Sequence, residues 1–374
     1  MIFKKRFYFI CSLLPFLFLA CAETSEKTSS AQNNSVSEAV PDLRDQKIWR
    51  IAVISDMNKS YGSTTYDQPV TNAIKFITEQ RMDLVLSTGD MVAGQKSDLN
   101  YQAMWNAFHS VVTKPLGNAK IPLLPSAGNH DASSGSGFQK ERELYVQNWK
   151  GYPIDRFNNE NRAVTLHPGV KQNYPLNYVA VAGRILLISL DATAVGPLIN
   201  NQLIWLEDVL QKTQDFKVKI IFGHVPLYPF AFGRAHESLA QGGRDFHQRM
   251  ESLLEKYNVN LFLSGHHHVY YPGHRNGHVQ YVSVPLLGSG ARVLMTRDQT
   301  VVKASPQGFL VIEIPENEPA FEALSAKDYS VIRTESLPEA ISVPTVNSSD
   351  CVGCASMPSN FFINAISRIL YYRR

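Results

Sequence analysis

The chain has 374 residues, enough for one large domain with terminal segments, and shows no internal repeat, glycine-rich phosphate loop or nucleophilic-serine motif. It carries 36 basic and 33 acidic residues, and three of the basic residues lie in the first 20 positions. Removal of that segment would leave 33 residues of each sign, and no net field to hold a long polyanion. We therefore expect no nucleic-acid partner, although a local basic patch is compatible with this balance.

The first 47 residues are typical of an export signal followed by a tether. Three basic residues at positions 4–6 precede an apolar stretch over residues 7–20, which is too short and too interrupted for a membrane span. Residues 1–20 are therefore predicted to be a signal peptide. Residues 21–47 hold mainly Ser, Thr, Glu, Asn and Gln, with too few apolar side chains to fold, so we expect a disordered tether.

The end of this signal resembles a bacterial lipobox. Residues 17–21 are Leu, Phe, Leu, Ala and Cys, and in a lipobox the cysteine, here Cys21, is lipidated and becomes the first mature residue. Phe18 departs from the pattern, which more often has leucine at that position. The alternative is ordinary cleavage near Ala20 or Ala22. We expect an exported protein of the cell envelope, attached to a membrane by an N-terminal lipid anchor and facing the periplasm or the exterior.

Residues 48–315 are predicted to form one α/β domain, because apolar segments of strand length alternate with amphipathic segments of helical spacing. Helices are expected over residues 68–80, 99–112, 199–213 and 245–257. Strands, in two sheets, are expected at residues 51–55, 84–89, 123–128, 176–181, 184–190, 219–223, 260–264, 279–284 and 309–314. Residues 132–175 are rich in Gly, Ser, Asn, Pro and aromatic side chains, and are expected to form a long connection that faces the substrate.

Five of the expected strands end at polar residues of the types that bind metals. These residues are Asp56, Asp90, Asn129-His130-Asp131, His224 and His266-His267-His268. In open α/β sheets, ligands bind beyond the carboxyl ends of the strands, so we expect these groups to meet in one site. On extended backbone, His266 and His268 would share a face, while His267 would point away and pack or face solvent. The alternative for this stretch is a solvated loop rich in histidine.

Taken in order, these motifs resemble those of the calcineurin-like metallophosphoesterases. The matching residues are Asp56-x-Asn58, Gly89-Asp90, Gly128-Asn129-His130-Asp131, Gly223-His224 and Gly265-His266-x-His268, within about residues 48–290. The resemblance implies a four-layer α/β/β/α sandwich of two mixed sheets flanked by helices, with a two-metal centre at one edge of the sheets. The purple acid phosphatases of this group have a tyrosine where this chain has Ala93, which argues against a coloured iron centre.

The resemblance also implies roles for the ligands. Asp90 would bridge the two metal ions, Asp56 and His268 would hold the first, and Asn129, His224 and His266 would hold the second. A carboxylate can bridge two cations, whereas a neutral amide or imidazole cannot easily do so. Two cations about 3.5 to 4 Å apart can clamp a phosphate and share a hydroxide of lowered pKa. Mn, Fe, Zn and Mg are the candidate metals.

Three further residues complete the predicted site. His130 directly follows Asn129, so its side chain should face the substrate and stabilise charge or protonate the leaving oxygen, a role that the resemblance also assigns. Asp131 would orient His130 by a hydrogen bond, and the alternative is an ordinary turn or helix-cap aspartate. Asn58 stands where the family usually has histidine. It would either bind the first metal through its amide oxygen or hydrogen-bond Asp56, with water completing the coordination.

Residues 316–374 lie outside the resemblance and are predicted to be a C-terminal tail. Within it, residues 361–370 have apolar side chains at helical spacing before a basic end. They would form an amphipathic helix that docks on its own domain or rests on a lipid surface. Cys351 and Cys354 are most simply a small disulfide outside the cytoplasm, with metal binding or redox exchange as alternatives.

Together these features predict an exported, lipid-anchored hydrolase that uses two metal ions to cleave a phosphate ester of a small substrate. The sequence leaves both monoesters and diesters open. An alternative of another class is a non-catalytic lipoprotein that keeps the fold and binds phosphate or metal. The intact set of Asp90, Asn129, His130, His224 and His266 favours the enzyme, because loss of function would usually erode these residues together.

Overall fold

The computed structural model describes residues 48–332, apart from residues 153, 155–162, 200, 235, 274–276, 295–305 and 315–318. The chain divides into two units, Met1–Asp45 and Gln46–Arg374, and every element below belongs to the second. The predicted signal peptide, the tether, residues 333–374 of the tail and both tail cysteines lie outside the described residues. In the part that is described, none of the helices has the length and hydrophobicity of a membrane span.

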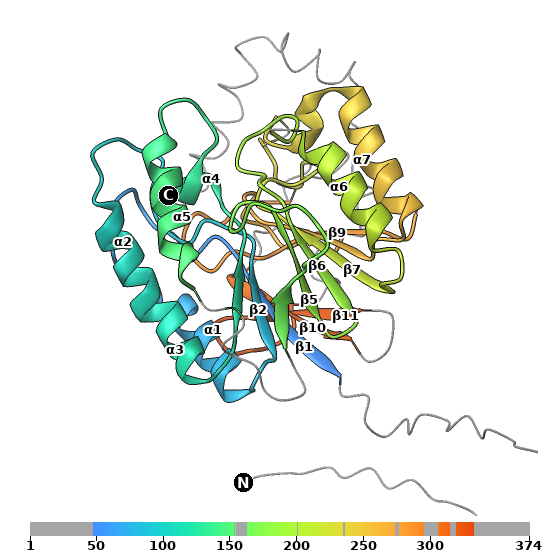
Figure 1. Cartoon of the computed structure of the whole chain (residues 1–374). Coiled ribbons are helices and arrows are strands. Elements are labelled where there is room, and N and C mark those ends of the chain that lie inside the picture. Colours follow the sequence, from blue (N-terminus) through green and yellow to red (C-terminus); the bar gives the residue numbers. More distant parts are fainter. Residues whose placement is uncertain are drawn as a thin grey trace, which may run out of the picture. The chain divides into compact units, whose positions relative to one another are not determined.

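Two mixed sheets form the centre of the second unit (Figure 1). In the first sheet the strand order is β11-β10-β1-β2-β3; β1 to β3 are parallel, and β10 and β11 are antiparallel to their neighbours. Its strands are β1 (Trp49–Ile54), β2 (Leu84–Ser87), β3 (Leu123–Pro125), β10 (Gly308–Ile314) and β11 (Ala320–Ser325). The second sheet has the order β4-β5-β6-β7-β8-β9, and β6 to β9 are parallel. Its strands are β4 (Val164–Leu166), β5 (Tyr178–Ala182), β6 (Ile185–Ser189), β7 (Val218–Phe222), β8 (Leu261–Ser264) and β9 (Gln280–Ser283).

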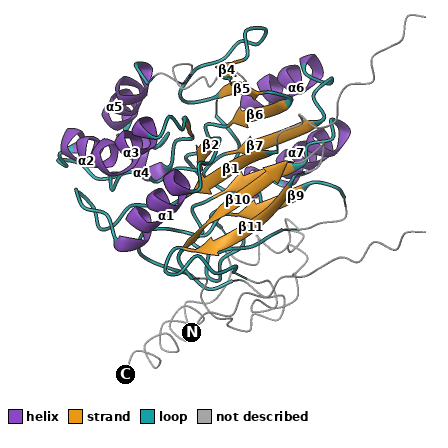
Figure 2. Ribbon diagram, turned by 90° about the horizontal axis from the view of Figure 1, so that it is seen from below, coloured by secondary structure: helices purple, strands orange, loops and turns teal. Residues whose placement is uncertain are grey.

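Helices cover the outer face of each sheet, which gives the predicted four layers, as Figures 1 and 2 show. The first sheet is covered by α1 (Gln68–Glu79), α2 (Tyr101–Phe108), α3 (Lys114–Asn118) and α5 (Gln139–Lys150). The second is covered by α6 (Gln202–Lys212) and α7 (Arg244–Lys256). Shorter elements are α4 (Asn129–Ala132), a π-helix (His109–Thr113) and a 3-10 helix (Leu239–Gly242). The fold class predicted from the sequence is confirmed.

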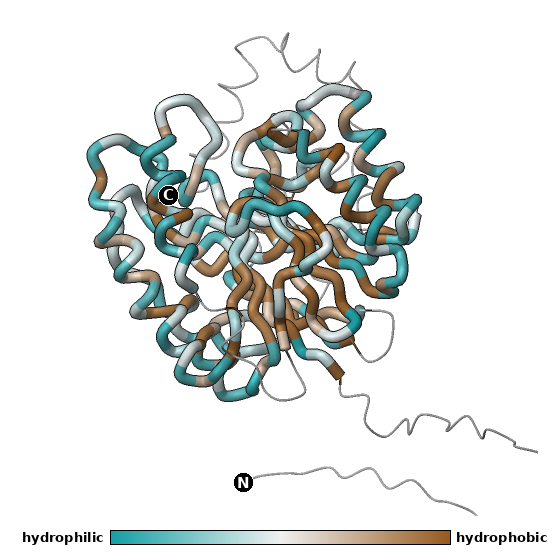
Figure 3. Tube along the Cα trace, in the orientation of Figure 1, coloured by the Kyte–Doolittle hydropathy of each residue, from teal (hydrophilic) through white to brown (hydrophobic). Residues whose placement is uncertain are grey.

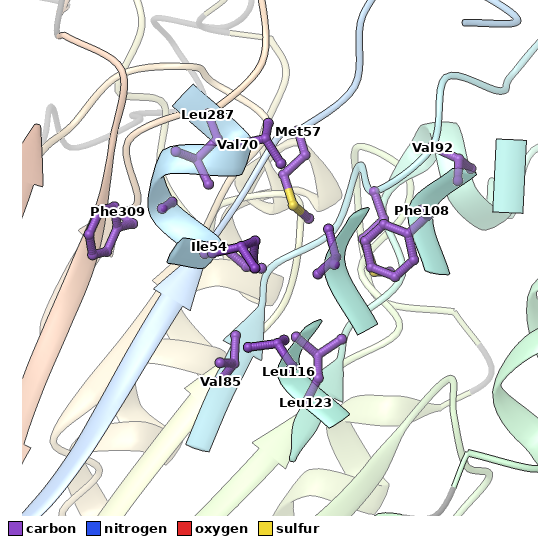
Figure 4. Close-up of a cluster of buried hydrophobic side chains, with 14 of the residues drawn as sticks. Ile54, Met57, Val70, Val85, Val92, Phe108, Leu116, Leu123, Leu287 and Phe309 are labelled. Carbon is purple, nitrogen blue, oxygen red and sulfur yellow. The ribbon is translucent and has the colours of Figure 1, made fainter. Parts of the chain in front are cut away.

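The parallel strands are apolar along their length because both of their faces are buried. In β1, Ile51 and Val53 lie in the cluster between the sheets, whereas Ala52 and Ile54 lie in the cluster under the helices. Figure 3 shows this hydrophobic interior, with hydrophilic residues on the helices and loops. Figure 4 shows the helix-facing side of the first sheet, with the strand residues Ile54, Val85 and Leu123 beside the helix residues Val70, Phe108 and Leu116.

Each predicted helix and strand is present with shifted ends, but two predicted boundaries are wrong. Residues 132–175 are not one long connection, because α5 and β4 lie within them. Helix α5 is polar at most positions, and its buried side chains are Glu141, Tyr145 and Trp149, which recur every four residues. The domain also continues past residue 315, because β11 pairs with β10 and so belongs to the first sheet.

The strand register brings the carboxyl ends of the parallel strands level. Ile54 of β1 is level with Ser87 of β2, which is level with Pro125 of β3. In the second sheet, Phe222 of β7 is level with Leu263 of β8. The loops that follow these five strands therefore start at one edge of each sheet, and they carry the predicted site residues.

Candidate metal centre

The predicted ligands lie on tight turns that begin as soon as the strands end. Asp56 (φ 47°), Asp90 (φ 55°), His266 (φ 66°) and His268 (φ 56°) have left-handed backbone conformations, which residues other than glycine rarely adopt. Such conformations cluster at functional sites, where surrounding contacts stabilise them. One such contact joins two of the loops, since the N–H of Asp56 donates to the carbonyl O of Gly89 at 3.0 Å.

Glycines beside the ligands allow the loops to approach one another. A Cβ atom on Gly128 would collide with the backbone N and Oδ1 of Asp90. A Cβ atom on Gly265 would collide with Oγ of Ser55 and Oδ2 of Asp56. Each of these ligand motifs is therefore preceded by glycine because the neighbouring loop leaves no room for a side chain.

One group of ligand atoms, which we call the carboxylate half-site, comes from Asp56, Asp90 and His268. Its atoms lie within 4.8 Å of one another. Nε2 of His268 is 3.3 Å from Oδ1 of Asp56, and Nδ1 is 3.0 Å from the carbonyl O of Gly290. Because a carbonyl only accepts, Nδ1 carries a proton and Nε2 faces the carboxylates. Burial would raise the pKa of Asp56, but the charge of His268 outweighs it, and the pKa is lowered.

A second group, the imidazole half-site, comes from Asn129, His224 and His266. Oδ1 of Asn129 lies 2.8 Å from Nε2 of His224 and 2.9 Å from Nδ1 of His266. These two nitrogens are 3.2 Å apart. Oδ1 of Asp90 lies 3.3 Å from Nε2 of His224. Asp90 therefore contacts both half-sites, as a bridging ligand must.

Each imidazole of this half-site has an oxygen atom on its far side. Nδ1 of His224 lies 2.9 Å from the carbonyl O of Thr88. Nε2 of His266 lies 3.1 Å from the carboxylate Oε2 of Glu237. Neither oxygen can donate, so a ring that binds a metal through its inward nitrogen would keep its proton on the outward nitrogen.

The amide of Asn129 is oriented in the same way. Its Nδ2 donates to Oε1 of Gln95 at 2.8 Å, which turns Oδ1 toward the two imidazoles. Lone pairs of one oxygen and two nitrogens then face one another, and they repel unless a proton or a cation lies among them. Oxygen and imidazole nitrogen are donors that divalent metals bind. The residues of both half-sites therefore fit metal ions.

The pKa values show the same demand for positive charge. Burial would lower the pKa of His224, but the Asp90 carboxylate beside it raises the pKa to about 9. Burial would raise the pKa of Asp90, but His224 and His130 outweigh this effect and hold the pKa far below its usual range. A buried carboxylate that stays ionised needs a cationic neighbour, which a bound metal would also provide.

Asn58 lies beside the bridging carboxylate. Its Nδ2 donates to Oδ2 of Asp90 at 3.5 Å, and its backbone N–H donates to the carbonyl O of Asp90 at 3.2 Å. The predicted hydrogen bond from Asn58 to Asp56 is therefore replaced by one to Asp90. Metal binding through Oδ1 of Asn58 stays a prediction.

His130, on α4, faces the site without joining either half-site. Its Nδ1 lies 2.9 Å from the carbonyl O of Gly94 and so carries the proton of the neutral ring. Its Nε2 lies 3.9 Å from Oδ2 of Asp90. The ring also packs against Tyr61, with ring centroids 5.4 Å apart. Nε2 is thus the nitrogen available to a substrate.

The predicted hydrogen bond between the His130 imidazole and the Asp131 carboxylate is wrong. Oδ1 of Asp131 accepts from the N–H groups of Met91 (2.8 Å) and Val92 (2.9 Å). Oδ2 accepts from the N–H of Gly128 at 2.9 Å. Asp131 therefore caps the start of α4 and ties it to the loop after β2, which is the alternative that its position in the sequence left open.

The three consecutive histidines point in different directions. His266 reaches the imidazole half-site and His268 reaches the carboxylate half-site. The predicted extended backbone, on which these two side chains would share a face, is wrong because both residues are left-handed. His267 is buried; its Nδ1 accepts from the N–H of Phe230 at 2.9 Å, and its Nε2 donates to the carbonyl O of Glu237 at 2.7 Å.

Two residues that support the ligands, Gln95 and Glu237, were not predicted from the sequence. Glu237 lies in the loop after β7, and its Oε2 is 3.1 Å from Nη1 of Arg234, which donates to the carbonyl O of His266 at 2.7 Å. Burial would raise the pKa of Glu237, but His266 and Arg234 lower it to about 2. Glu237 thus gives His266 the carboxylate partner that metal-binding histidines commonly have.

Sequence comparison identifies the family to which these motifs correspond. Residues 50–270 match the family model described as calcineurin-like phosphoesterase. The match covers more than half of the chain and includes every predicted ligand as well as His130. No curated protein sequence matches the chain.

Three solved structures that resemble this chain have low sequence identity to it. A purple acid phosphatase from yellow lupin (Lupinus luteus) seeds has a TM-score of 0.53 and 19% identity, over 76% of this chain and 52% of that one. This chain thus matches about half the length of the lupin enzyme, and at this identity the likeness shows the fold alone. GAP50, described as the anchor in the inner membrane complex of Plasmodium, has a TM-score of 0.49 and 18% identity, over 76% of this chain and 87% of that one. A dimetal phosphatase from Danio rerio has a TM-score of 0.47 and 14% identity, over 75% of this chain and 99% of that one.

Proposed function

Because the chain belongs to the calcineurin-like phosphoesterase family, we propose that it hydrolyses a phosphate ester with two metal ions, one in each half-site. One observation carries the proposal. Inward-facing donors of the imidazole half-site lie 2.8 to 3.2 Å apart, and Asp90 contacts both this group and the carboxylate half-site. Two sites that share one carboxylate suit two neighbouring cations.

The two half-sites divide the ligands between the metal ions. The first ion would be held by Asp56, Asp90 and His268, with Asn58 as a further candidate, and the second by Asp90, Asn129, His224 and His266. When bound, the two ions would polarise the phosphate and lower the pKa of a water molecule. Thr88, Gln95 and Glu237 lie at the outward atoms of the imidazole half-site and would help to direct its lone pairs toward the second ion.

His130 would supply the proton that the leaving group needs. In hydrolysis, a water molecule loses a proton as its oxygen bonds to phosphorus, the bond between phosphorus and the leaving oxygen breaks, and the leaving oxygen takes up a proton. Nδ1 of His130 is hydrogen-bonded to the carbonyl O of Gly94. Nε2 is therefore the atom that would donate a proton to the leaving oxygen. Both half-sites should still bind metal without His130, because its ring belongs to neither of them.

A second candidate function is a lipoprotein that binds phosphate or metal without turnover. Asn58 is the observation that favours it, because an amide oxygen is usually a weaker donor than an imidazole nitrogen for transition metals. We favour the enzyme because Nε2 of His130 faces the site, 3.9 Å from Oδ2 of Asp90, and because both half-sites retain their other ligands. The substrate would be a small phosphorylated molecule and not an extended nucleic acid, and both monoesters and diesters remain candidates.

The test is hydrolysis of chromogenic phosphomonoesters and phosphodiesters by the purified protein after addition of Mn, Fe, Zn or Mg. We expect turnover with at least one metal, and its loss in the Asp90→Asn variant measured beside it. Metal binding without turnover of any ester would favour the non-catalytic candidate. Equal turnover in both proteins would locate the chemistry elsewhere or assign it to a contaminant.

We also propose that the protein is exported and attached to a membrane through a lipid on Cys21. The support is the basic segment at positions 4–6, the apolar stretch over residues 7–20 and the likeness of residues 17–21 to a lipobox. Change of Cys21 to Ser should move the protein from the membrane fraction to a soluble fraction. Continued membrane association of this variant would point to the amphipathic segment at residues 361–370.

A further inference from the structure

Tyr61 is an exposed aromatic side chain at the rim of the metal centre. Among the described residues, the exposed large hydrophobic side chains are Ile48, Tyr61, Val195, Ile204 and Val331. Of these, Tyr61 alone carries a ring; it is 55% exposed and lies at an angle of 36° to the ring of His130. An exposed ring contributes little to folding, because much of its apolar surface stays in water. Its place beside the proton-carrying residue therefore needs another explanation.

The backbone on either side of Tyr61 is attached to the loop of the bridging carboxylate. Before it, the N–H of Asn58 donates to the carbonyl O of Asp90 at 3.2 Å. After it, the N–H of Gly62 donates to the carbonyl O of Ala93 at 2.8 Å. The ring is thus held at a defined place relative to Asp90, although solvent reaches it. A positioned but exposed ring is suited to contact a ligand.

The geometry points to Tyr61 as the residue that selects the leaving group, by packing its ring against a planar aromatic group on the leaving oxygen. This inference rests on the proposed function, because it requires the leaving oxygen to lie at Nε2 of His130. The substituent on that oxygen then lies beside Tyr61, because the ring centroids of Tyr61 and His130 are 5.4 Å apart. The neighbouring cation Lys59 is paired with Asp67 at 2.7 Å, so this part of the rim is better suited to an uncharged ring than to a second phosphate.

The expected size of the effect follows from aromatic packing. Packing of two aromatic rings in an offset or edge-to-face arrangement is favourable beyond the burial of their surface, and it changes an equilibrium constant by about twofold to tenfold. A small alkyl leaving group would cover less of the Tyr61 ring and would gain less. The substrate class that fits is therefore a phosphate ester of an alcohol or phenol that carries an aromatic ring close to the ester oxygen.

The experiment compares kcat/KM for phenyl phosphate and ethyl phosphate in the wild type, Tyr61→Ala and Tyr61→Phe. We expect Tyr61→Ala to lower kcat/KM for phenyl phosphate about twofold to tenfold more than for ethyl phosphate. Tyr61→Phe should keep the wild-type preference because it keeps the ring. The control is Ile204→Ala, which removes a side chain that is 61% exposed on α6 and should leave both substrates unaffected. An equal loss on both substrates would overturn the inference, since it would mean that Tyr61 only supports His130.

A binding measurement separates failure of this inference from failure of the proposed function. Calorimetry of the metal-loaded protein with phenylphosphonate and methylphosphonate does not require turnover. We expect Tyr61→Ala to weaken phenylphosphonate binding more than methylphosphonate binding. Absence of hydrolysis in the wild type, with this binding preference intact, would contradict the proposed function alone. Hydrolysis in the wild type, with no difference between the two phosphonates in Tyr61→Ala, would contradict the aromatic preference alone.

Discussion

The two half-sites hold their ligands by different means. The imidazole half-site uses one amide and two imidazoles, and each of them has a partner at its outward atom, in Gln95, Thr88 or Glu237. The carboxylate half-site depends on charge, since the atoms of its two aspartates and His268 lie within 4.8 Å of one another. The imidazole half-site therefore depends on the partners that orient its amide and its rings, whereas the carboxylate half-site depends more on its two carboxylate charges.

This difference predicts how each half-site should respond to substitution. An oriented amide or imidazole loses affinity for a metal when its supporting partner is removed, although the ligand itself remains. A buried carboxylate keeps its position, but loss of its charge removes attraction for every cation close to it. Substitution of Asp90 should disable both half-sites, whereas substitution of Gln95 or Glu237 should weaken only one.

The largest effect should come from Asp90→Asn. The variant keeps the shape of a side chain that accepts from the N–H of His130 at 2.9 Å, but it removes the charge shared by the half-sites. We expect turnover to fall by at least about a thousandfold, because each metal contributes several kcal/mol of charge stabilisation. Circular dichroism should show that the fold is retained. Near-native activity of a folded variant would refute the bridging role.

His130→Ala should slow the chemistry and leave both half-sites loaded. General acid and base groups contribute about a hundredfold to ten-thousandfold, so kcat should fall within that range. Metal titration by calorimetry should give two sites with the wild-type affinities, because Nε2 of His130 lies 3.9 Å from Asp90 and its Nδ1 faces Gly94. Loss of metal together with rate would make His130 a ligand.

Asp90 and His130 were predictable because each occupies a short motif that directly follows an apolar strand. The strands were recognisable since both of their faces are buried, and the order of the motifs placed the loops at one edge. The backbone conformation of the turns after the strands was predicted incorrectly. Left-handed backbone at His266 and His268 cannot be inferred from a hydrophobic pattern, so the extended backbone predicted there was wrong, although the family resemblance had assigned the two histidines to different metals.

The supporting residues were not predictable for a related reason. Glu237 and His266 are 29 positions apart, and Gln95 and Asn129 are 34 positions apart. These pairs meet only because irregular loops adopt particular conformations, and no periodicity in the sequence encodes such contacts. The capping role of Asp131 depended on the backbone N–H groups of Met91 and Val92 in another loop. The metal ligands are therefore easier to predict from the sequence than the residues that orient them.

Glu237→Ala should weaken the imidazole half-site specifically. Without the carboxylate, Nε2 of His266 loses its partner at 3.1 Å and the imidazole can rotate or change tautomer. We expect about a tenfold to hundredfold loss of metal affinity at one of the two sites in a calorimetric titration. Glu237→Gln should recover part of the loss because its amide oxygen still accepts.

The matched control for this experiment is Glu255→Ala. Glu255 also pairs with a histidine, since its Oε2 lies 2.6 Å from Nδ1 of His278, but this pair is outside the metal centre. Both metal sites should be unchanged in Glu255→Ala. An equal weakening of both sites in Glu237→Ala would show that the carboxylate acts through its charge on the whole centre and not by orienting His266.

Asn58→His should raise the metal affinity of the carboxylate half-site by about tenfold. Changes around metal ligands typically alter affinity by about tenfold to a hundredfold, and we expect the lower value here. An imidazole nitrogen would replace an amide group beside Asp90, and metal preference should shift toward Zn or Fe and away from Mn or Mg. Asn58→Ala should weaken the same site. Calorimetric curves identical in all three proteins would remove Asn58 from the metal centre and leave that ion to Asp56, Asp90, His268 and solvent.

The smallest effect should come from Gln95→Leu. Oε1 of Gln95 accepts from Nδ2 of Asn129 at 2.8 Å, and this bond directs the amide oxygen toward His224 and His266. Without it, the Asn129 amide can turn and present Nδ2, which cannot bind a metal. A hydrogen bond of this kind is worth about 0.5–1.5 kcal/mol, so metal affinity at the imidazole half-site should fall about twofold to tenfold. Gln95→Glu keeps an acceptor at that position and should retain the orientation of Asn129. If Gln95→Leu and Gln95→Glu weakened metal binding equally, the loss would come from disturbance of the loop and not from the missing acceptor. The difference between the two half-sites would then not include the orientation of Asn129 by Gln95.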